Sequence, residues 1–329
     1  MQDQVEHELQ LSQVETHTGV CNTLDEIRTE VTRLRRAVIA AGERSGCGVA
    51  SSGSHAMRLE DGNRVTPKRA YLQLEEDYQL VMREQVVCGC HVHVGISDAE
   101  AAVQVMNACR QWLPVLLALS TNSPFWQGAD SGYASFRTEV WRRWPMAGPP
   151  EPFASRAEYD ELVANLVAAR AIDDPARIYW DVRPSARFDT LEFRVADACL
   201  TVDETVMMAG LTRALVRTAH DRWRRGKPPV SPRQELLRAA TWRAARYGLD
   251  GELIDLESCR SMPSAELVGD LLRFVGPALA DAGEWQEIVE LVRVVQSRGT
   301  GAHRQREVFA RRGRLEDVVH FVLDETAPE

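Results

Sequence analysis

VVCGCHVHVGISDAEAAV, residues 86–103, contains the pattern that decides the fold, a strand that leads directly into a helix. Alternation along Val86–Val94 places His91 and His93 on one face of the strand and turns Val92 and Val94 toward a core. Asp98 is a typical helix N-cap. Two imidazoles on one face suit a metal ion or a phosphate group, and hydrogen bonding within a polar sheet face is an equally open alternative.

The segment after this strand is predicted to be one long helix followed by one long loop. Ala99–Leu119 is largely apolar, and Pro114 is expected to kink the helix. Ser120–Pro152 is rich in Gly, Pro, Trp and Ser without periodicity, and a loop of that length inside a compact domain is usually functional. Its portion Gly128–Arg137 combines flexible glycines with charged side chains, which suits recognition of a charged substrate.

A second polar strand face is predicted in TLEFRV, Thr190–Val195. A period of two places Glu192 and Arg194 together and three apolar side chains opposite. Such a pair could hold a cation and a phosphate in one pocket, and an ordinary ion pair is the alternative. Arg183 is expected on the turn after a strand at Ile178–Val182, where it would reach an anion or be solvated.

The remaining segments predict an α+β protein. Thr23 followed by Glu26 is a capping-box pattern, and it precedes an amphipathic helix that ends within residues 42–48. The chain from Ser231 onward is expected to be mainly helical. We expect one domain over residues 1–329, with a possible internal boundary at residues 227–232. Further elements are predicted as strands at Leu9–Thr16 and within Val49–Met57, and as helices at Tyr71–Arg83, Arg156–Arg170 and Asp203–Arg224.

Composition favours a small-molecule partner. The formal net charge is −9, whereas nucleic acids and acidic membranes attract proteins with a basic surface. The chain has no apolar run long enough to cross a bilayer, and its polar start lacks a signal-peptide pattern, so we expect a cytoplasmic protein. The seven scattered cysteines contain no CxxC pair and are expected to be reduced thiols.

Several long motifs together resemble one family, the type 2 glutamate–cysteine ligase-like carboxylate–amine ligases. They are LSQVETHTGVC, GCHVHVGISD, ALSTNSPFWQGADSGYASFR, IYWDVRPSARFDTLEFRVADACLT, AARYGLDG and RGTGAHRQREVF. The resemblance implies a glutamine-synthetase-like fold, in which an antiparallel sheet backed by helices forms a cradle for ATP and Mg²⁺. It also implies a reaction in which ATP phosphorylates a carboxylate, the amine of a second substrate attacks the acyl phosphate, and ADP and phosphate are released. The implied substrates are amino acids, namely glutamate with cysteine or another amine.

The same resemblance implies a metal site. On the strand expected at Leu9–Thr16, Glu15 shares a face with other polar groups. The family pattern makes Glu15, His91, His93 and Glu192 the expected ligands, because hard cations that bridge phosphate oxygens are held by carboxylates with a little imidazole.

Arginine side chains are expected to bind the anionic groups. By resemblance, Arg194 would stabilise the transferred phosphoryl group and act with Glu192 in catalysis. Arg183 and Arg137 would contact phosphate or the substrate carboxylate through fork-like hydrogen bonds. Asp130, in the glycine-rich loop, is the other expected substrate contact.

The chain also departs from the family pattern. Relatives of this kind usually carry an N-terminal G-x-E-x-E strand whose glutamates bind magnesium, and this sequence is expected to lack it. Glu6 and Glu8 have a similar spacing but are expected to align with a later strand. Ser51–Met57 stands where a Thr-His-Pro segment is common. These departures leave two alternatives open: the true start lies upstream of Met1, or the protein is a truncated relative that binds ATP or amino acids with little or no turnover.

Two further classes are weaker alternatives. A metal-dependent hydrolase built on His91 and His93 would need more ligands at suitable spacing than the other histidines supply. A pure interaction protein would leave the polar strand faces unexplained. Resemblance also suggests a homodimer.

Overall fold

The computed structural model describes residues 4–58 and 64–328. Its strands are β1 (Val5–His7), β2 (Val14–Thr16), β3 (Gly89–Gly95), β4 (Phe125–Trp126), β5 (Ala129–Asp130), β6 (Ala147–Gly148), β7 (Tyr179–Trp180), β8 (Val182–Pro184), β9 (Thr190–Asp197), β10 (Glu252–Asp255) and β11 (Arg260–Pro263). Its helices are α1 (Leu24–Arg44), α2 (Arg69–Tyr78), α3 (Leu80–Arg83), α4 (Ala99–Cys109), α5 (Leu113–Ser120), α6 (Phe136–Trp141), α7 (Arg156–Ala168), α8 (Val202–Arg224), α9 (Gln234–Tyr247), α10 (Ser264–Asp281), α11 (Trp285–Arg298), α12 (Gly301–Arg312) and α13 (Leu315–Thr326).

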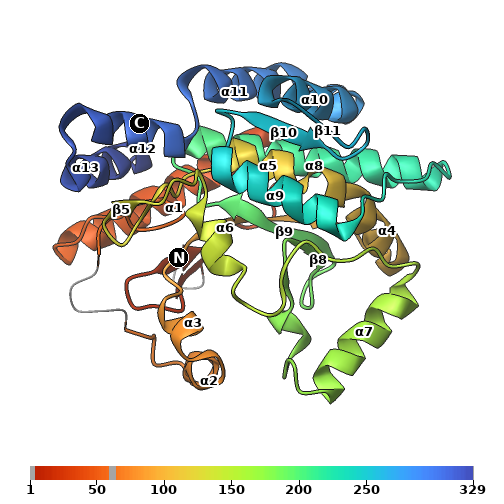
Figure 1. Ribbon diagram of the computed structural model, residues 1–329, viewed down its shortest axis with the longest axis horizontal. Coiled ribbons are helices and arrows are strands. Elements are labelled where there is room, and N and C mark those ends of the chain that lie inside the picture. The colour runs from red at the N-terminus through yellow and green to blue at the C-terminus, as the bar shows by residue number, and fades with distance from the viewer. Residues whose placement is uncertain (1–3, 59–63, 329) are drawn as a thin grey trace.

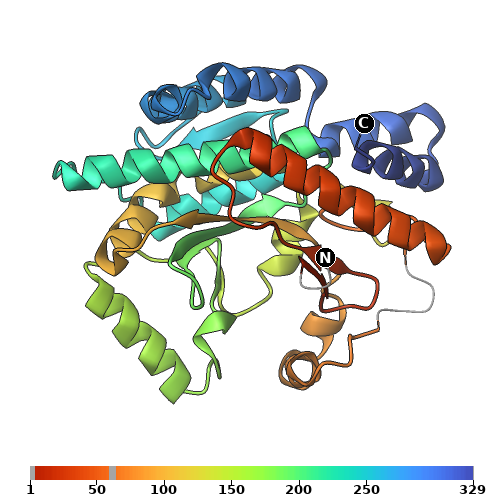
Figure 2. The same cartoon turned by 180° about the vertical axis from the view of Figure 1, so that it is seen from behind.

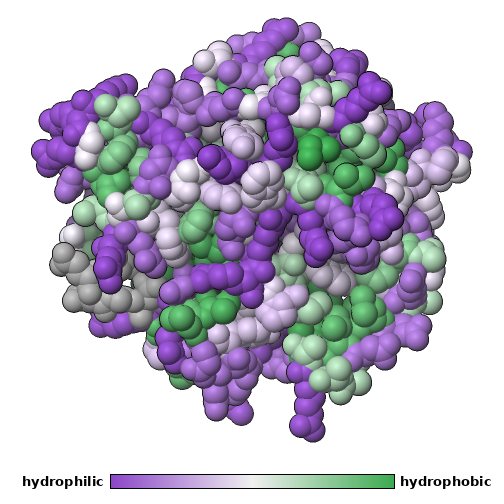
Figure 3. All heavy atoms as spheres, in the orientation of Figure 1, coloured by the Kyte–Doolittle hydropathy of each residue, from purple (hydrophilic) through white to green (hydrophobic). Residues whose placement is uncertain are grey.

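Helices are layered on one face of a central antiparallel sheet with the strand order β3–β9–β8 (Figure 1). In this view α5, α8 and α9 lie above the sheet, with α10 and α11 farther out, whereas α3 and α7 lie below it on two sides. Seen from behind, α1 runs alongside α8 (Figure 2). The predicted α+β class, an antiparallel sheet backed by helices, is confirmed. The surface seen in Figure 3 is mostly hydrophilic, with apolar side chains in separate patches.

The central sheet has one apolar and one polar face. Leu191, Phe193 and Val195 of β9 are buried in the largest hydrophobic cluster, together with side chains of α4, α5 and α8. The antiparallel register sets Glu192 of β9 opposite His93 of β3 on one side and opposite Arg183 of β8 on the other. Period-two alternation thus places apolar side chains on one face of the sheet and polar side chains on the other, as the sequence predicted.

The helix predicted over Ala99–Leu119 is broken rather than continuous. Asp98 caps α4 through its side chain, as expected. A short 3₁₀ turn, Arg110–Trp112, then separates α4 from α5, and Pro114 lies in the first turn of α5. Proline has no N–H to donate to the carbonyl of Arg110, four residues back, and its ring would clash with that carbonyl, so the kink predicted at Pro114 becomes a break.

Several predicted boundaries are wrong. The strand expected at Leu9–Thr16 is only Val14–Thr16, and it pairs with β1, which was not predicted. Val49–Met57 contains no strand; it contributes a single bridge from Ser54 to Val87. The helix expected over Tyr71–Arg83 is interrupted at Gln79, where φ is 48°.

The C-terminal part of the chain is not entirely helical, because β10 and β11 form a hairpin. The Asp255 carboxylate accepts hydrogen bonds from the backbone N–H groups of Glu257 and Ser258 and so builds the turn. Beyond the 227–232 segment, Ala244 and Leu271 share the largest hydrophobic cluster with α8. No helix within residues 4–58 and 64–328 is long and apolar enough to cross a bilayer.

Candidate active site

Glu192 is the centre of the polar sheet face. Its buried carboxylate accepts a hydrogen bond from Arg183 Nε at 2.8 Å through Oε2, and another from Arg194 Nη1 through Oε1. Burial alone would raise the pKa of Glu192, but the positive charges of Arg194 and Arg183 outweigh it and lower the pKa to about 2. The carboxylate is therefore ionised and shared between two guanidinium groups.

Both predicted histidines lie beside this carboxylate. His93 Nε2 is 3.8 Å and His91 Nδ1 is 3.9 Å from Glu192 Oε1. Burial, with the nearby Arg194 charge, lowers the pKa of both histidines. A neutral imidazole has a lone pair that can bind a metal or accept a hydrogen bond. The hydrogen bond between His93 Nδ1 and Thr190 Oγ1, at 2.9 Å, orients the His93 ring.

The two arginines that hold Glu192 differ in what else they contact. Arg183 Nη1 also donates to the carbonyl oxygens of Ala176, at 2.6 Å, and Ile178, so this side chain braces the segment before β7. Arg194 Nη1 contacts His91 Nδ1 at 3.5 Å, and its Nε is buried without a partner. Arg194 Nη2 has no hydrogen bond from the described residues and is not among their buried unpartnered atoms. The Arg194 side chain is mostly buried, and Nη2 is therefore the nitrogen left accessible to a ligand.

Glu15 lies close enough to this cluster for its charge to act on Arg194 and His93. Part of its side chain contacts solvent, yet packing around the carboxyl and the neighbouring Glu8, to which it is hydrogen-bonded, raise the pKa of Glu15 to about 7. Two carboxyl groups side by side are a favourable place for a cation. Glu8 was not predicted to take part.

The four predicted metal ligands do not form a ready-made metal cluster. Across residues 4–58 and 64–328, no group of three or more His, Cys, Asp or Glu side chains is arranged to hold a metal ion. Glu192 directs its oxygens at arginines, whereas neither Glu8 nor Glu15 forms an ion pair with another described residue. Mg²⁺ is often bound by one or two carboxylates, with phosphate oxygens and water completing its coordination, and the Glu8–Glu15 pair suits that kind of site.

The two expected substrate contacts lie in different places. Arg137 is buried, and its guanidinium donates to the carbonyl oxygens of Arg194, at 3.0 Å, and Val195, at 3.3 Å, behind the polar face. Asp130 is held by Arg306 through Nε and Nη2, at 2.9 and 2.6 Å. Arg137 thus supports β9 from beside the cluster, and Asp130 lies against α12.

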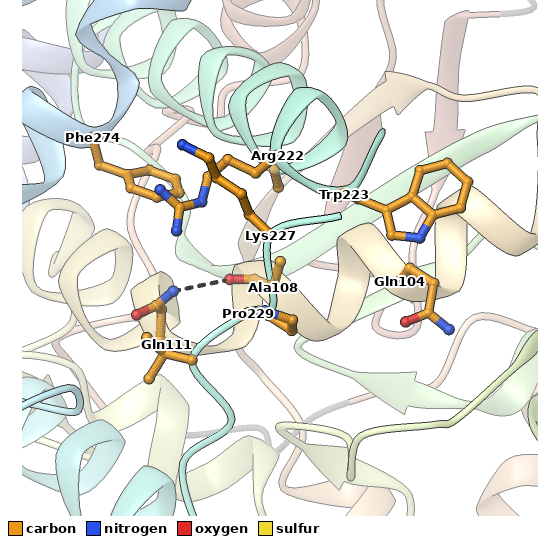
Figure 4. A pocket seen from close by; sticks show the side chains of 10 residues that line it. Gln104, Ala108, Gln111, Arg222, Trp223, Lys227, Pro229 and Phe274 are labelled. Carbon is orange, nitrogen blue, oxygen red and sulfur yellow. Dashed lines mark hydrogen bonds between the residues drawn. The ribbon is translucent and has the colours of Figure 1, made fainter. Parts of the chain in front are cut away.

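Two surface pockets lie on the helical side of the molecule, and neither is lined by residues of the polar face. The pocket in Figure 4 has a volume of about 30 Å³, enough for water but not for a nucleotide. Its walls include Gln111, Arg222 and Phe274. A second, more open pocket of about 390 Å³ adjoins it at Phe274. We identify the candidate site by its chemistry.

Comparison with known proteins now gives the family. Residues 1–321 match the model of a family described as glutamate-cysteine ligase family 2. The chain belongs to this family. A family 2 relative from Frankia alni, provisionally named glutamate–cysteine ligase 2-2, is 46% identical over 319 residues, which cover 97% of this chain and 83% of that protein. A relative from Rhodopirellula baltica, provisionally named glutamate–cysteine ligase 2, is 42% identical over 325 residues, covering 99% and 86% of the two chains.

A solved structure agrees on the fold of this family 2 chain. The crystal structure of glutamate–cysteine ligase from Francisella tularensis in complex with AMP superposes with a TM-score of 0.72, covering 99% of this chain and 82% of that one. The identity is 12%, so the likeness concerns the fold alone. The family resemblance read from the motifs is confirmed.

Three side chains near the site were missed by sequence reasoning. Glu8 is hydrogen-bonded to Glu15, and the rings of Trp141 and Tyr179 lie 5.6 and 6.0 Å from the Arg194 guanidinium carbon. Glu8 could have been found from the sequence if a hairpin that brings it next to Glu15 had been predicted. No local signal pointed to the two aromatic residues, because they reach Arg194 only through the tertiary fold.

The raised pKa of Glu15 predicts a pH-dependent effect of Glu15→Gln on stability. A folded-state pKa of about 7 means that the stability linked to this group is fully present below its ordinary pKa near 4.5 and is lost as the pH rises through 7. The glutamine variant escapes that loss. Its melting temperature relative to the parent chain should therefore be higher at pH 8 than at pH 5 by roughly 1–3 °C, a small value because Glu15 is partly exposed.

Thermal melts of both chains at pH 5, 6.5 and 8 would measure this effect. Glu235→Gln is the matched control, since Glu235 forms an exposed ion pair with Arg233. A difference between Glu15→Gln and the parent that is the same at every pH would show that Glu15 titrates normally.

Proposed function

We propose that this chain is an ATP-dependent carboxylate–amine ligase of the glutamate–cysteine ligase type. Membership in family 2 supports the proposal, as do the names of the relatives and the AMP-bound ligase with the same fold. The observation that carries it is the Arg194 guanidinium, held by Glu192 and His91 with Nη2 facing solvent, beside a pair of carboxyl groups. Cationic donors next to a cation-binding carboxylate pair are what phosphoryl transfer requires.

The proposed reaction joins two amino-acid substrates. The γ-phosphoryl group of ATP would pass to an oxygen of the carboxylate substrate, and ADP would leave as the bond to its β-phosphate oxygen breaks. The amine of the second substrate would then attack the acyl carbon, phosphate would leave with the electrons of the broken C–O bond, and the amine would lose a proton to solvent. Arg194 Nη2 would donate to an oxygen of the transferred phosphoryl group. Glutamate and cysteine, or another amine, are the proposed substrates, and a homodimer remains a prediction.

Magnesium would neutralise charge on the phosphate oxygens when bound. Glu15 and Glu8 are the residues that we propose hold it, with phosphate oxygens and water completing the coordination. His91 and His93, as neutral imidazoles, would orient Arg194 and receive hydrogen bonds from the substrates. Glu192 would serve chiefly as the counter-charge that positions Arg183 and Arg194.

The test is ADP release by the purified chain with Mg²⁺, ATP, glutamate and cysteine, with mass spectrometry of the products. ADP formation that requires both amino acids, together with a dipeptide of the expected mass, would support the ligase. A panel of other amines would follow if glutamate alone supports slow ADP release. Saturable ATP binding without ADP release from any pair would instead support a nucleotide-binding relative without turnover, and neither binding nor release would refute both.

A further inference from the structure

Helix α6 contacts Arg194 with two side chains that lie one turn apart. Arg137 and Trp141 are separated by four residues and therefore share one face of the helix. Arg137 Nη2 donates to the Arg194 carbonyl oxygen at 3.0 Å, while the Trp141 ring centre is 5.6 Å from the Arg194 guanidinium carbon. One helix thus holds both the backbone and the side chain of the same arginine.

The position of Trp141 is itself fixed by its surroundings. Its indole Nε1 donates to the carbonyl oxygen of Tyr179 at 3.4 Å, and the Tyr179 ring meets the indole edge to face at 5.4 Å. Tyr179 also packs on the buried Trp144, at 5.3 Å between ring centres. The same Trp141 ring lies 5.9 Å from the Arg137 guanidinium carbon, so one indole contacts both arginines.

These contacts restrict Arg194 to one orientation. Glu192 and His91 engage Nη1, and Nε is buried. With the ion pair alone, the guanidinium could still rotate about its Nη1 hydrogen bond to Glu192. Aromatic rings beside the guanidinium oppose that rotation, because a cation is attracted to the face of an indole and the ring fills the space into which the group would turn.

We propose that Trp141 is a positioning residue that orients Arg194 so that Nη2 faces the phosphoryl group. This inference rests on the proposed function, which gives Arg194 its role. Trp141 acts through Arg194 and its own ring need not touch a substrate. Gly89 leaves room for the Arg137 guanidinium, since a Cβ at this position would lie 2.3 Å from Arg137 Nη2 and would displace that group from the Arg194 carbonyl oxygen.

The first measurement does not depend on catalysis. NMR spectra of the full chain labelled with ¹⁵N-arginine would resolve the Nε–Hε signal of Arg194, assigned by its absence in Arg194→Lys. In the parent chain, ring currents should displace this signal, and Trp141→Leu should move it toward the position of an ordinary arginine. Trp141→Phe keeps an aromatic face and should keep part of the displacement, whereas Trp223→Leu, on α8 beside the pocket in Figure 4, should leave it unchanged.

The second measurement is kinetic. Trp141→Leu should lower kcat about tenfold, in line with the loss of a partly buried cation–π contact, with KM for the amino acids nearly unchanged. Trp141→Phe should recover most of the rate. An Arg194 signal that does not move in Trp141→Leu would overturn the proposal whether or not the chain is a ligase. A shifted signal in a chain that releases no ADP would support the positioning by Trp141 and count only against the proposed function.

Discussion

Arg194→Lys is expected to lower kcat by about two to three orders of magnitude while the fold is retained. Arg194 engages Glu192 and His91 with Nη1, which leaves Nη2 available, so in the proposed reaction one planar group would bridge the protein and the phosphoryl group. Lysine keeps the charge but offers a single ammonium, which can satisfy Glu192 or a phosphate oxygen and not both in the same geometry. It also loses the stacking against Trp141 and Tyr179.

Steady-state kinetics of ADP release, alongside circular dichroism and a thermal melt, would measure this prediction. Arg233→Lys is the control, because Arg233 is an exposed arginine whose ion pair with Glu235 involves no residue of the polar sheet face. Near-parental kcat in Arg194→Lys would remove this side chain from the proposed phosphoryl site. A loss of folding would be seen in the melt and would call for Arg194→Gln, which keeps a hydrogen-bond donor without the charge.

Glu192→Gln should have the second-largest effect, on stability and on activity together. Removing the Glu192 charge leaves the buried guanidinium groups of Arg183 and Arg194 without their negative partner, which lowers the free energy of unfolding by about 3 kcal/mol. The amide keeps the shape of the side chain and one acceptor oxygen, so the variant is expected to fold. Its kcat should fall about a hundredfold, because Arg194 is then held less firmly.

The pH dependence of this effect follows from the lowered pKa of Glu192. A group with a folded pKa of about 2 contributes stability that is fully present above its ordinary pKa near 4.5 and is lost as the pH falls toward 2. The destabilisation by Glu192→Gln should therefore be constant from pH 5 to 8 and shrink between pH 4.5 and 2. Denaturant unfolding at several pH values would show it, and a constant difference down to pH 2 would contradict the assignment.

Magnesium titration separates the two roles considered for Glu192. In the structure both carboxylate oxygens accept hydrogen bonds from arginines, so excess Mg²⁺ is not expected to restore activity to Glu192→Gln. Restoration at high Mg²⁺ would show that Glu192 binds the metal directly. Glu15→Gln removes one carboxyl of the proposed Mg²⁺ site and is the variant expected to regain activity at high Mg²⁺.

Much of the polar sheet face could be predicted from the sequence alone. Alternation placed Glu192 with Arg194 and His91 with His93, and these pairs do face the same side of the sheet. Alternation is a local property of an extended backbone, so it needs no knowledge of the rest of the molecule. The helix N-caps at Thr23 and Asp98 were predictable for the same reason.

Boundaries and short elements were harder to predict. The β1–β2 pairing and the β10–β11 hairpin depend on hydrogen bonds between segments, and strands of three or four residues have too little alternation to identify them. Asp130 was expected near the substrate because its loop is flexible and charged. Its partner Arg306 lies 176 residues away in the sequence and could not be foreseen.

The sequence by itself determined which residues share a face of each strand, where the main helices begin and to which family the chain belongs, because these depend on near-neighbour spacing and on long motifs. Only the tertiary structure decided that Arg183 and Arg194 meet on Glu192, that Glu8 lies beside Glu15, and that the Trp141 ring lies over the Arg194 guanidinium. Each of those contacts joins side chains from different elements. Their distances, and the pKa values that follow from burial and charge, are set only when the helices and the sheet pack together.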